Sequence, residues 1–371
     1  MIQEILRKFH EVAVCPRMQM EYYCSHGEKV ILTAPVYVPE EIIHSMGMVP
    51  FGAWGGDLEL SNSKQYYPAF ICSIAQSILE LGMKGNYKGA TAIIVPSLCD
   101  TLKTLGENWK YAVPSIPFIP MTYPQNRSTD FGIAYTKSSY EYVIQELEKL
   151  GGTFTLESLA KSNDVYNEHN KAMRQLSKIL AVHSGITASQ RSDIFKSAFF
   201  MKKEEHTVLV KELIKELENL ESNSEKIPVI LSGIIADNPE LNQIFDDCNL
   251  HIVADDIAAQ SRQYRVDVPE SEDALQALAM KFGKMDNCSV LYNSKKPRIQ
   301  WIIEQAKEYK AQGVIMVQTK FCDPEEFDYV ILKRACEKED ITLVTIELDR
   351  QMCKFEQIKT TIETFRDMLM L

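Results

Sequence analysis

Short, continuous apolar runs alternate along most of the chain with longer segments whose apolar residues recur at helical spacing. Runs such as 92–95 (Ala-Ile-Ile-Val) and 314–317 (Val-Ile-Met-Val) are typical of parallel strands that helices cover on both faces. The pattern predicts strands over 30–33, 48–54, 92–95, 116–122, 229–231, 251–254, 314–317 and 342–347. It predicts helices over 1–24, 39–46, 138–150, 270–285 and 299–312, others beginning near residues 72, 99, 239 and 322, and a last one running to residue 371. This alternation predicts an α/β fold with mostly parallel sheets flanked by helices.

The same pattern divides the chain into three parts. At 371 residues the chain is longer than one ordinary core requires, so two domains are expected. We expect an N-terminal α/β domain over 1–154 and a C-terminal α/β domain over 226–371. Between them, 155–225 contains no strand pattern and is expected to form a helical connecting segment, interrupted mainly at Gly185 and closed by a polar linker over 221–226.

Composition and charge exclude several classes of partner. Apolar residues make up 45% and charged residues 25% of the chain, as in soluble globular proteins. A formal charge of −11 argues against nucleic acid or an anionic membrane as a partner. No apolar run approaches the roughly 18 residues of a membrane span, and the amphipathic start lacks the apolar core of a signal peptide. The expected location is therefore the cytoplasm, where nine cysteines are not expected to form a disulfide framework.

Three cysteines occupy predicted helix entrances. Cys99 and Cys322 each follow a predicted strand and precede an aspartate, and Cys72 follows an aromatic-proline turn. We expect Asp100 and Asp323 to be the N-caps of their helices, and we expect the helix dipole to lower the pKa of the thiols. Three thiolates converging from separate elements are suited to an iron–sulfur cluster or a zinc ion.

Position alone leaves buried structural thiols as an equal alternative, because no Cys-x-x-Cys pair occurs. The other six cysteines are expected to be core or surface thiols: Cys248, Cys336 and Cys353 in helical patterns, Cys288 in a turn, and Cys15 and Cys24 near the first helix.

Most other candidate residues have a simple structural interpretation. His44 is expected to be a buried, hydrogen-bonded histidine. Acids in predicted first turns are expected to interact only with the helix dipole: Glu40, Glu41, Glu325 and Glu326. The expected aromatics of the core or an interface are Tyr37, Trp54 and Trp109.

Three further groups have polar side chains that a ligand would use. Asp255 and Asp256 end a predicted strand, and we expect them to be solvated loop acids. Arg262 and Arg265 are suited to the phosphate of a ligand or to a carboxylate across a subunit interface, and we favour the interface. Ser232-Gly233 follows a strand, but no Gly-x-Gly-x-x-Gly or Walker motif occurs, so ATP is expected to bind elsewhere.

Several of these stretches together resemble the 2-hydroxyacyl-CoA dehydratase family, which also contains benzoyl-CoA reductase subunits. The resemblance covers nearly the whole chain and is closest to the smaller, β subunit of heterodimeric (R)-2-hydroxyacyl-CoA dehydratases. The stretches that carry it are 35–44, 67–73, 96–102 and 320–329, with 166–169, 253–257 and 267–269 and the two arginines Arg262 and Arg265.

The resemblance implies a set of ligands, partners and a reaction. Cys72, Cys99 and Cys322 would bind one [4Fe-4S] cluster per subunit through three irons, with a non-cysteine ligand on the fourth. The partners would be a related α subunit, an ATP-hydrolysing iron–sulfur activator and an acyl-CoA substrate. The reaction would be the reversible, syn-type removal of water from an (R)-2-hydroxyacyl-CoA to give an (E)-2-enoyl-CoA through a ketyl radical. Two alternatives stay open: a benzoyl-CoA reductase-type subunit and a non-catalytic α/β metal-binding module.

Overall fold

Two parallel four-stranded sheets organise the computed structural model, which describes residues 1–223 and 225–371. The first sheet has the order β2-β1-β3-β4 and contains β1 (Val30–Thr33), β2 (Val49–Gly52), β3 (Ala92–Pro96) and β4 (Phe118–Met121). The second has the order β6-β5-β7-β8 and contains β5 (Ile227–Gly233), β6 (Leu250–Ile257), β7 (Gly313–Thr319) and β8 (Thr342–Leu348). The predicted α/β class, the parallel sheets and all eight strands are confirmed.

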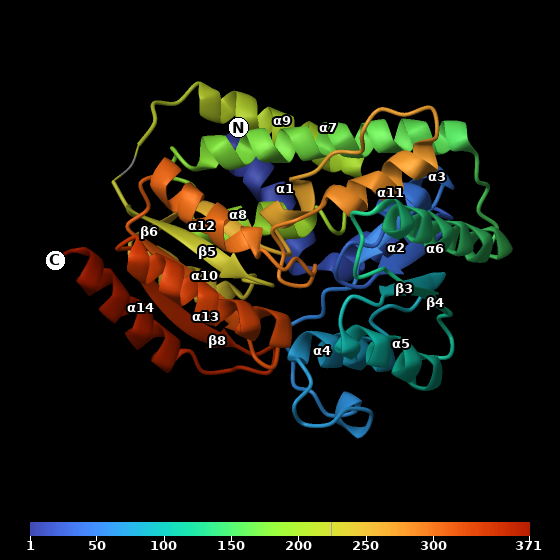
Figure 1. Ribbon diagram of the computed structural model, residues 1–371, viewed down its shortest axis with the longest axis horizontal. Helices are drawn as coiled ribbons and strands as arrows, with labels where there is room; N and C mark the ends of the chain where they lie inside the picture. The colour runs from blue at the N-terminus through green and yellow to red at the C-terminus, as the bar shows by residue number, and fades with distance from the viewer. Residues whose placement is uncertain (224) are drawn as a thin grey trace.

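Helices flank both sheets (Figure 1). In the first half they are α1 (Ile2–Val14), α2 (Pro16–Ser25), α3 (Glu40–Ser45), α4 (Ser73–Met83), α5 (Asp100–Ala112) and α6 (Asp130–Lys149), with the short 3₁₀ helix η1 (Ser63–Gln65). In the second half they are α10 (Pro239–Asp247), α11 (Ala274–Lys284), α12 (Pro297–Glu308), α13 (Asp323–Lys338) and α14 (Glu356–Leu369), with the 3₁₀ helix η2 (Ser261–Tyr264).

The segment between the sheets is helical, as predicted, and forms α7 (Leu156–Leu180), α8 (Ala188–Ser197) and α9 (Lys203–Glu218). Helices α7 and α9 pack together and lie along one side of the molecule, where α7 contacts α3 and α11 as well as β6 (Figure 1). Helix α7 therefore contacts both halves of the molecule. Residue 224 of the predicted linker lies outside the described residues.

One predicted helix begins earlier than expected. The sequence pattern predicts a helix from residue 138, but α6 begins at Asp130, because the Thr129 side chain accepts a hydrogen bond from the Gly132 backbone N–H and caps it. Among the described residues, no helix has the length and apolar character needed to cross a membrane.

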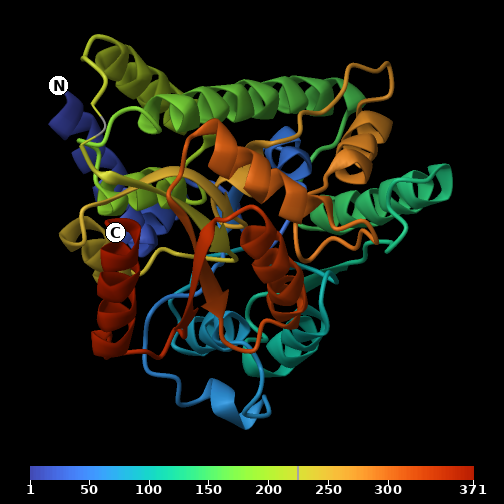
Figure 2. The same ribbon diagram turned by 60° about the vertical axis from the view of Figure 1, so that its left-hand side comes forward.

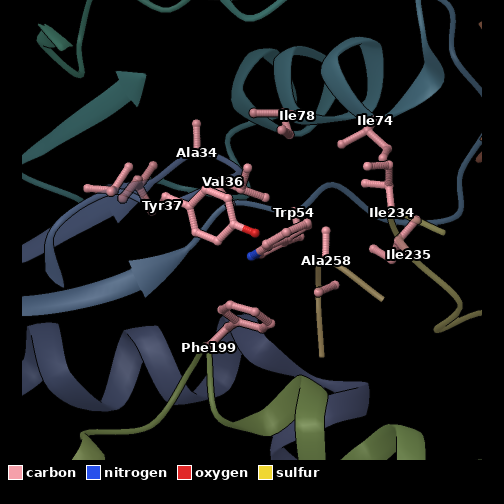
Figure 3. Packing of buried hydrophobic residues seen from close by; sticks show 14 of the residues in the cluster. Ala34, Val36, Tyr37, Trp54, Ile74, Ile78, Phe199, Ile234, Ile235 and Ala258 are labelled. Carbon is pink, nitrogen blue, oxygen red and sulfur yellow. The ribbon is translucent and has the colours of Figure 1, made fainter. Parts of the chain in front are cut away.

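An apolar seam joins the two sheets at the carboxyl ends of β1 and β5. Figure 3 shows Trp54 between Tyr37 and Ala258 of the second half, with Phe199 below it. The Trp54 and Phe199 ring centroids are 5.0 Å apart. The seam belongs to one continuous core that includes residues of both sheets, so the halves pack as a unit. The predicted burial of Tyr37, Trp54 and Trp109 is confirmed.

Candidate metal centre

The three predicted cysteines occupy equivalent positions, because each is the residue that immediately precedes a helix. Cys72 precedes α4, Cys99 precedes α5 and Cys322 precedes α13. In the first half, α4 follows a loop and α5 follows β3, whereas α13 follows β7 in the second half (Figures 1 and 2). In both views one end of α13 points toward α4 and α5. The helix entrances of two sheets therefore meet at one place.

The expected capping roles of the two aspartates are wrong by one position. Helices α5 and α13 begin at Asp100 and Asp323, so the cysteine before each is the N-cap. Asp100 pairs with Lys103 at 3.0 Å on an exposed helix face. In both helices the aspartate lies in the first turn, where its charge is favourable to the helix dipole.

The three thiols are electrostatic neighbours. Cys99 raises the pKa of Cys72, and both raise the pKa of Cys322. Each of the three cysteine residues is partly exposed as a whole and packs against the core, and its thiol is on the buried side. The structure thus brings together Cys72, Cys99 and Cys322, which we call the cysteine group.

The pKa values of the cysteine group differ from the prediction. Burial raises the pKa of Cys72 to about 11, although the first-turn N–H groups of Ala75 and Ile74 lower it. Burial also raises the pKa of Cys99, against the N–H groups of Leu102 and Thr101. The helix dipole acts as expected, but the loss of hydration outweighs it, so the expectation of a lowered pKa is wrong.

The Cys322 thiol has the weakest support from its helix. Its pKa is raised well above the usual value by burial, then by the Glu325 charge and by Cys72. The second residue of α13 is Pro324, which has no N–H to offer a thiolate. Only the Glu325 N–H lowers the pKa of Cys322.

Two acids that we expected in a solvated loop are instead buried within β6. Asp255 and Asp256 are 2% and 0% exposed. Asp255 forms an ion pair with Arg191, and Asp256 forms one with Arg262 at 2.9 Å. Arginines outweigh the effect of burial and hold the pKa of Asp256 well below its usual value. The prediction failed because two consecutive acids near the end of a strand look the same in the sequence as two acids in a solvated loop.

The two arginines that we assigned to a subunit interface are used inside the chain. The Arg262 side chain is 1% exposed, and it contacts Asp256 and Glu325. Arg265 pairs with Asp256 at 3.1 Å and stacks on the Trp301 ring, with 3.5 Å between guanidinium carbon and ring centroid.

Glu325, expected to be only a first-turn acid, is completely buried and is held by two arginines. Its carboxylate lies 2.8 Å from Arg298 Nη2 and 3.3 Å from Arg262 Nη2. Arg298 also contacts Asp256 at 2.6 Å and Asp328 at 3.0 Å. We call these five residues the ion network. Sequence analysis missed Arg298 because nothing in a helical pattern distinguishes a buried arginine from a surface one.

A second group of charges missed by the sequence analysis supports the Cys72 helix. Arg350 follows β8, and its backbone N–H donates to the Ser73 hydroxyl, which is at the first position of α4. The Arg350 guanidinium pairs with Asp57 and Asp237. The second half therefore contacts the start of the helix that Cys72 precedes.

The remaining predicted residues have the simple roles expected of them, with few exceptions. His44 is hydrogen-bonded, as expected, to Ser162 and Glu204, at 2.8 and 2.9 Å. It is only partly buried, however, because its side chain is 24% exposed, so the predicted burial is wrong. The two acids of the α3 first turn have additional partners, Glu40 with Lys203 and Glu41 with Lys281. The cysteines outside the group are buried or surface thiols, as predicted: Cys15, Cys24, Cys248, Cys288, Cys336 and Cys353. Cys353 was expected in a helix, but it lies in the exposed segment before α14.

The seam between the sheets contains cavities of different sizes. Two that are lined by both Trp54 and Phe199 have volumes of about 60 and 20 Å³. A third, of about 590 Å³, is lined by Trp54 together with Phe200 and Asp237. This cavity and another of about 370 Å³ have no member of the cysteine group in their linings. An acyl-CoA therefore has no matching cavity next to these thiols among those described.

Comparison with known proteins gives a family match over most of the chain. Residues 35–369 match the model of the 2-hydroxyglutaryl-CoA dehydratase D-component. The chain is 43% identical to the (R)-phenyllactyl-CoA dehydratase beta subunit of Clostridium sporogenes, over 94% of each chain. It is 37% identical to the beta subunit of (R)-2-hydroxyglutaryl-CoA dehydratase of Acidaminococcus fermentans, over 99% of this chain and 100% of the relative. It is also 28% identical to one of the benzoyl-CoA reductase subunits of Thauera aromatica, over 93% of this chain and 92% of the relative.

Proposed function

The chain belongs to the family of the 2-hydroxyglutaryl-CoA dehydratase D-component, and on this premise we propose that it is the β subunit of a cytoplasmic (R)-2-hydroxyacyl-CoA dehydratase that carries a [4Fe-4S] cluster on Cys72, Cys99 and Cys322. The dehydratase relatives are beta subunits at 36 to 43% identity, whereas the benzoyl-CoA reductase relative is at 28%. This difference favours dehydration of a 2-hydroxyacyl-CoA over ring reduction.

The observation that carries the proposal is the cysteine group, three thiols at three helix entrances that influence one another's pKa. Thiolates are the usual ligands of iron–sulfur clusters, and each of the three would hold a different iron. A zinc ion would instead need its thiolates about 2.3 Å from one centre. Among the described residues, no group of three or more His, Cys, Asp or Glu side chains is placed to hold a metal ion. We therefore base the choice of a cluster over a single ion on the family match.

When bound, the cluster would supply one electron at low potential. That chemistry suits the reaction, because the C3 hydrogen of a 2-hydroxyacyl-CoA is not acidic. One electron added to the thioester carbonyl gives a ketyl radical anion, which expels the 2-hydroxyl as hydroxide. The enoxy radical that results has an acidic C3–H. Loss of this proton and return of the electron leave the 2-enoyl-CoA, so the net change is the loss of one water.

The residues of this chain would hold and insulate the cluster. The cysteine group would provide three ligands in surroundings dry enough to raise all three thiol pKa values, and binding would release the thiol protons. The apolar seam behind it excludes water (Figure 3). Because no member of the cysteine group lines the cavity of about 590 Å³, we assign most of the substrate pocket to a partner α subunit.

The proposal is tested by preparing the chain without oxygen, alone and with a matching α subunit. We expect about four irons and four sulfides per chain. We expect dehydration of a 2-hydroxyacyl-CoA only when the α subunit, an ATP-hydrolysing activator, ATP and a reductant are all present. Stoichiometric zinc in freshly isolated anaerobic protein, or turnover by this chain alone with dithionite, would contradict the proposal.

A further inference from the structure

We infer that Glu325 is a positioning residue for Cys322: clamped by Arg262 and Arg298, it fixes the first turn of α13 and places a negative charge beside the cluster. The inference rests on the proposed function for the cluster, but its geometric part concerns this chain alone. In this inference, the ion network determines the position and the surroundings of one cluster ligand, Cys322.

The clamp acts on the turn that Cys322 begins. The backbone N–H groups of Glu325 and Glu326 both donate to the Cys322 carbonyl oxygen, at 3.0 and 3.1 Å. The Glu325 side chain leaves this turn and enters the interior, where Arg298 Nη2 lies 2.8 Å away and Arg262 Nη2 lies 3.3 Å away. The Ser289 hydroxyl donates a further hydrogen bond to the same carboxylate. Three groups from three segments therefore determine where the Cys322 turn lies.

Burial explains why these contacts hold the turn firmly. The side chains of Arg262 and Arg298 are 1% and 2% exposed, and that of Glu325 is 0% exposed. Moving the carboxylate away would leave two buried guanidinium groups with one acid fewer, and breaking a buried pair is far more costly than breaking a surface pair. The Cys322 turn is thus coupled to β6 through Asp256, which contacts both arginines.

The other two ligands lack a comparable charge. The first-turn residues of α4 are Ser73, Ile74 and Ala75. The acid in the α5 first turn, Asp100, points to solvent, with a side chain that is 97% exposed. Cys322 is therefore the only member of the cysteine group with a buried carboxylate in its own first turn. Residues in this outer position around a metal site tune both the affinity and the potential of the metal.

The experiment uses Glu325→Gln, with Asp328→Asn as the matched control. Asp328 is a second buried carboxylate of the ion network, and it shares Arg298 with Glu325. It lies one turn further from Cys322, so its substitution removes the same charge from the network without releasing the first turn. Ser289→Ala is a milder variant that removes one hydrogen bond and no charge.

Hydrogen exchange of the cluster-free protein measures positioning without any iron. We expect the peptide that spans residues 319–331 to exchange faster in Glu325→Gln than in the wild type, with a smaller change in Ser289→Ala. Asp328→Asn is expected to leave the exchange of the first turn unchanged. Equal exchange in Glu325→Gln and the wild type, or an equal increase in Asp328→Asn, would overturn the positioning role.

The cluster-loaded protein gives a second readout. We expect Glu325→Gln to lose iron to a chelator about tenfold faster than the wild type. Its cluster should be reduced at a higher potential, because the substitution removes a negative charge from the cluster's surroundings. Asp328→Asn should change the rate of iron loss less than about twofold. An unchanged rate and potential in Glu325→Gln would overturn the inference, whereas a wild-type protein that binds no iron would refute the proposed function and leave the hydrogen-exchange result standing.

Discussion

Arg350 and Asp57, which belong to opposite halves of the chain, form an ion pair with 3.0 Å between Nη1 and Oδ1. The same guanidinium nitrogen lies 2.7 Å from Asp237, and the Arg350 side chain is only 2% exposed. Burial alone would raise the pKa of Asp237, but the charges of Arg350 and Lys196 hold it well below its usual value. The contact between the two halves therefore depends on a buried cation as well as on the apolar seam.

Replacing this cation should strongly destabilise the protein. We expect Arg350→Met to lower the free energy of unfolding by about 3–5 kcal/mol, because it removes a buried cation and leaves Asp57 without it and Asp237 with Lys196 alone. Urea unfolding followed by circular dichroism measures the change. Arg366→Met is the matched control: it removes a surface arginine that pairs with Asp367, and it should leave the free energy of unfolding almost unchanged. A loss of stability in Arg350→Met as small as in the control would contradict the assignment.

Two buried histidines should make the fold sensitive to mild acid. His169 Nε2 lies 3.0 Å from His206 Nδ1, and His206 Nε2 lies 3.0 Å from the Ile194 carbonyl oxygen. Because a carbonyl oxygen only accepts, His206 carries its proton on Nε2 and accepts from His169. Burial lowers the pKa of His206 to about 3 and that of His169 well below its usual value.

The sign of the pH dependence follows from these lowered values. Below about pH 6.5 the unfolded chain takes up protons that the folded chain does not bind, so stability is complete above that pH and is lost as the pH falls. Each histidine contributes up to about 1.4 kcal/mol per pH unit. The variant His169→Gln/His206→Gln should show a shallower loss between pH 6.5 and 5, whereas His26→Gln, on the surface, should retain the wild-type slope. Parallel slopes for all three proteins would rule out this account.

Single substitutions in the cysteine group should remove the proposed cluster. We expect Cys72→Ala, Cys99→Ala and Cys322→Ala each to reduce the iron content of anaerobically prepared protein to a small fraction of the wild-type value. Cys336→Ala is the control, because Cys336 is also on α13 but is buried in the core away from the helix entrance. Full iron content in any one of the three variants would exclude that residue as a ligand.

Air should destroy the cluster without unfolding the chain. In the proposed cluster, three cysteines would leave one iron with an exchangeable or weaker ligand, which oxygen would attack first. We expect visible absorbance to disappear in air and a three-iron signal to appear in electron paramagnetic resonance. Circular dichroism should change little, because two sheets that share an apolar core are stable on burial alone. Simultaneous loss of absorbance and helicity would mean that the cluster is a structural support.

Sequence patterns predicted the strands and the cysteine group because both depend on local signals. A buried parallel strand is an unbroken apolar run, and a helix entrance is marked by acids and proline, as at Pro324. The ion network has no such signal. Asp256, Arg298 and Glu325 are far apart in the sequence, and each taken alone resembles a surface charge. Only the packing of β6, α12 and α13 brings them together, so their burial could not be predicted from local composition.

The division of the cysteine group between the two sheets has a consequence for biosynthesis. Cys72 and Cys99 leave the ribosome long before Cys322, which becomes available only after β7 and the start of α13 have been made. A nascent chain that ends before this point presents two thiols and no third. Insertion of the proposed cluster is therefore expected to be a late maturation step that follows the pairing of β7 with β5. A cell that runs short of iron or sulfide would accumulate a folded but empty precursor rather than a misfolded chain.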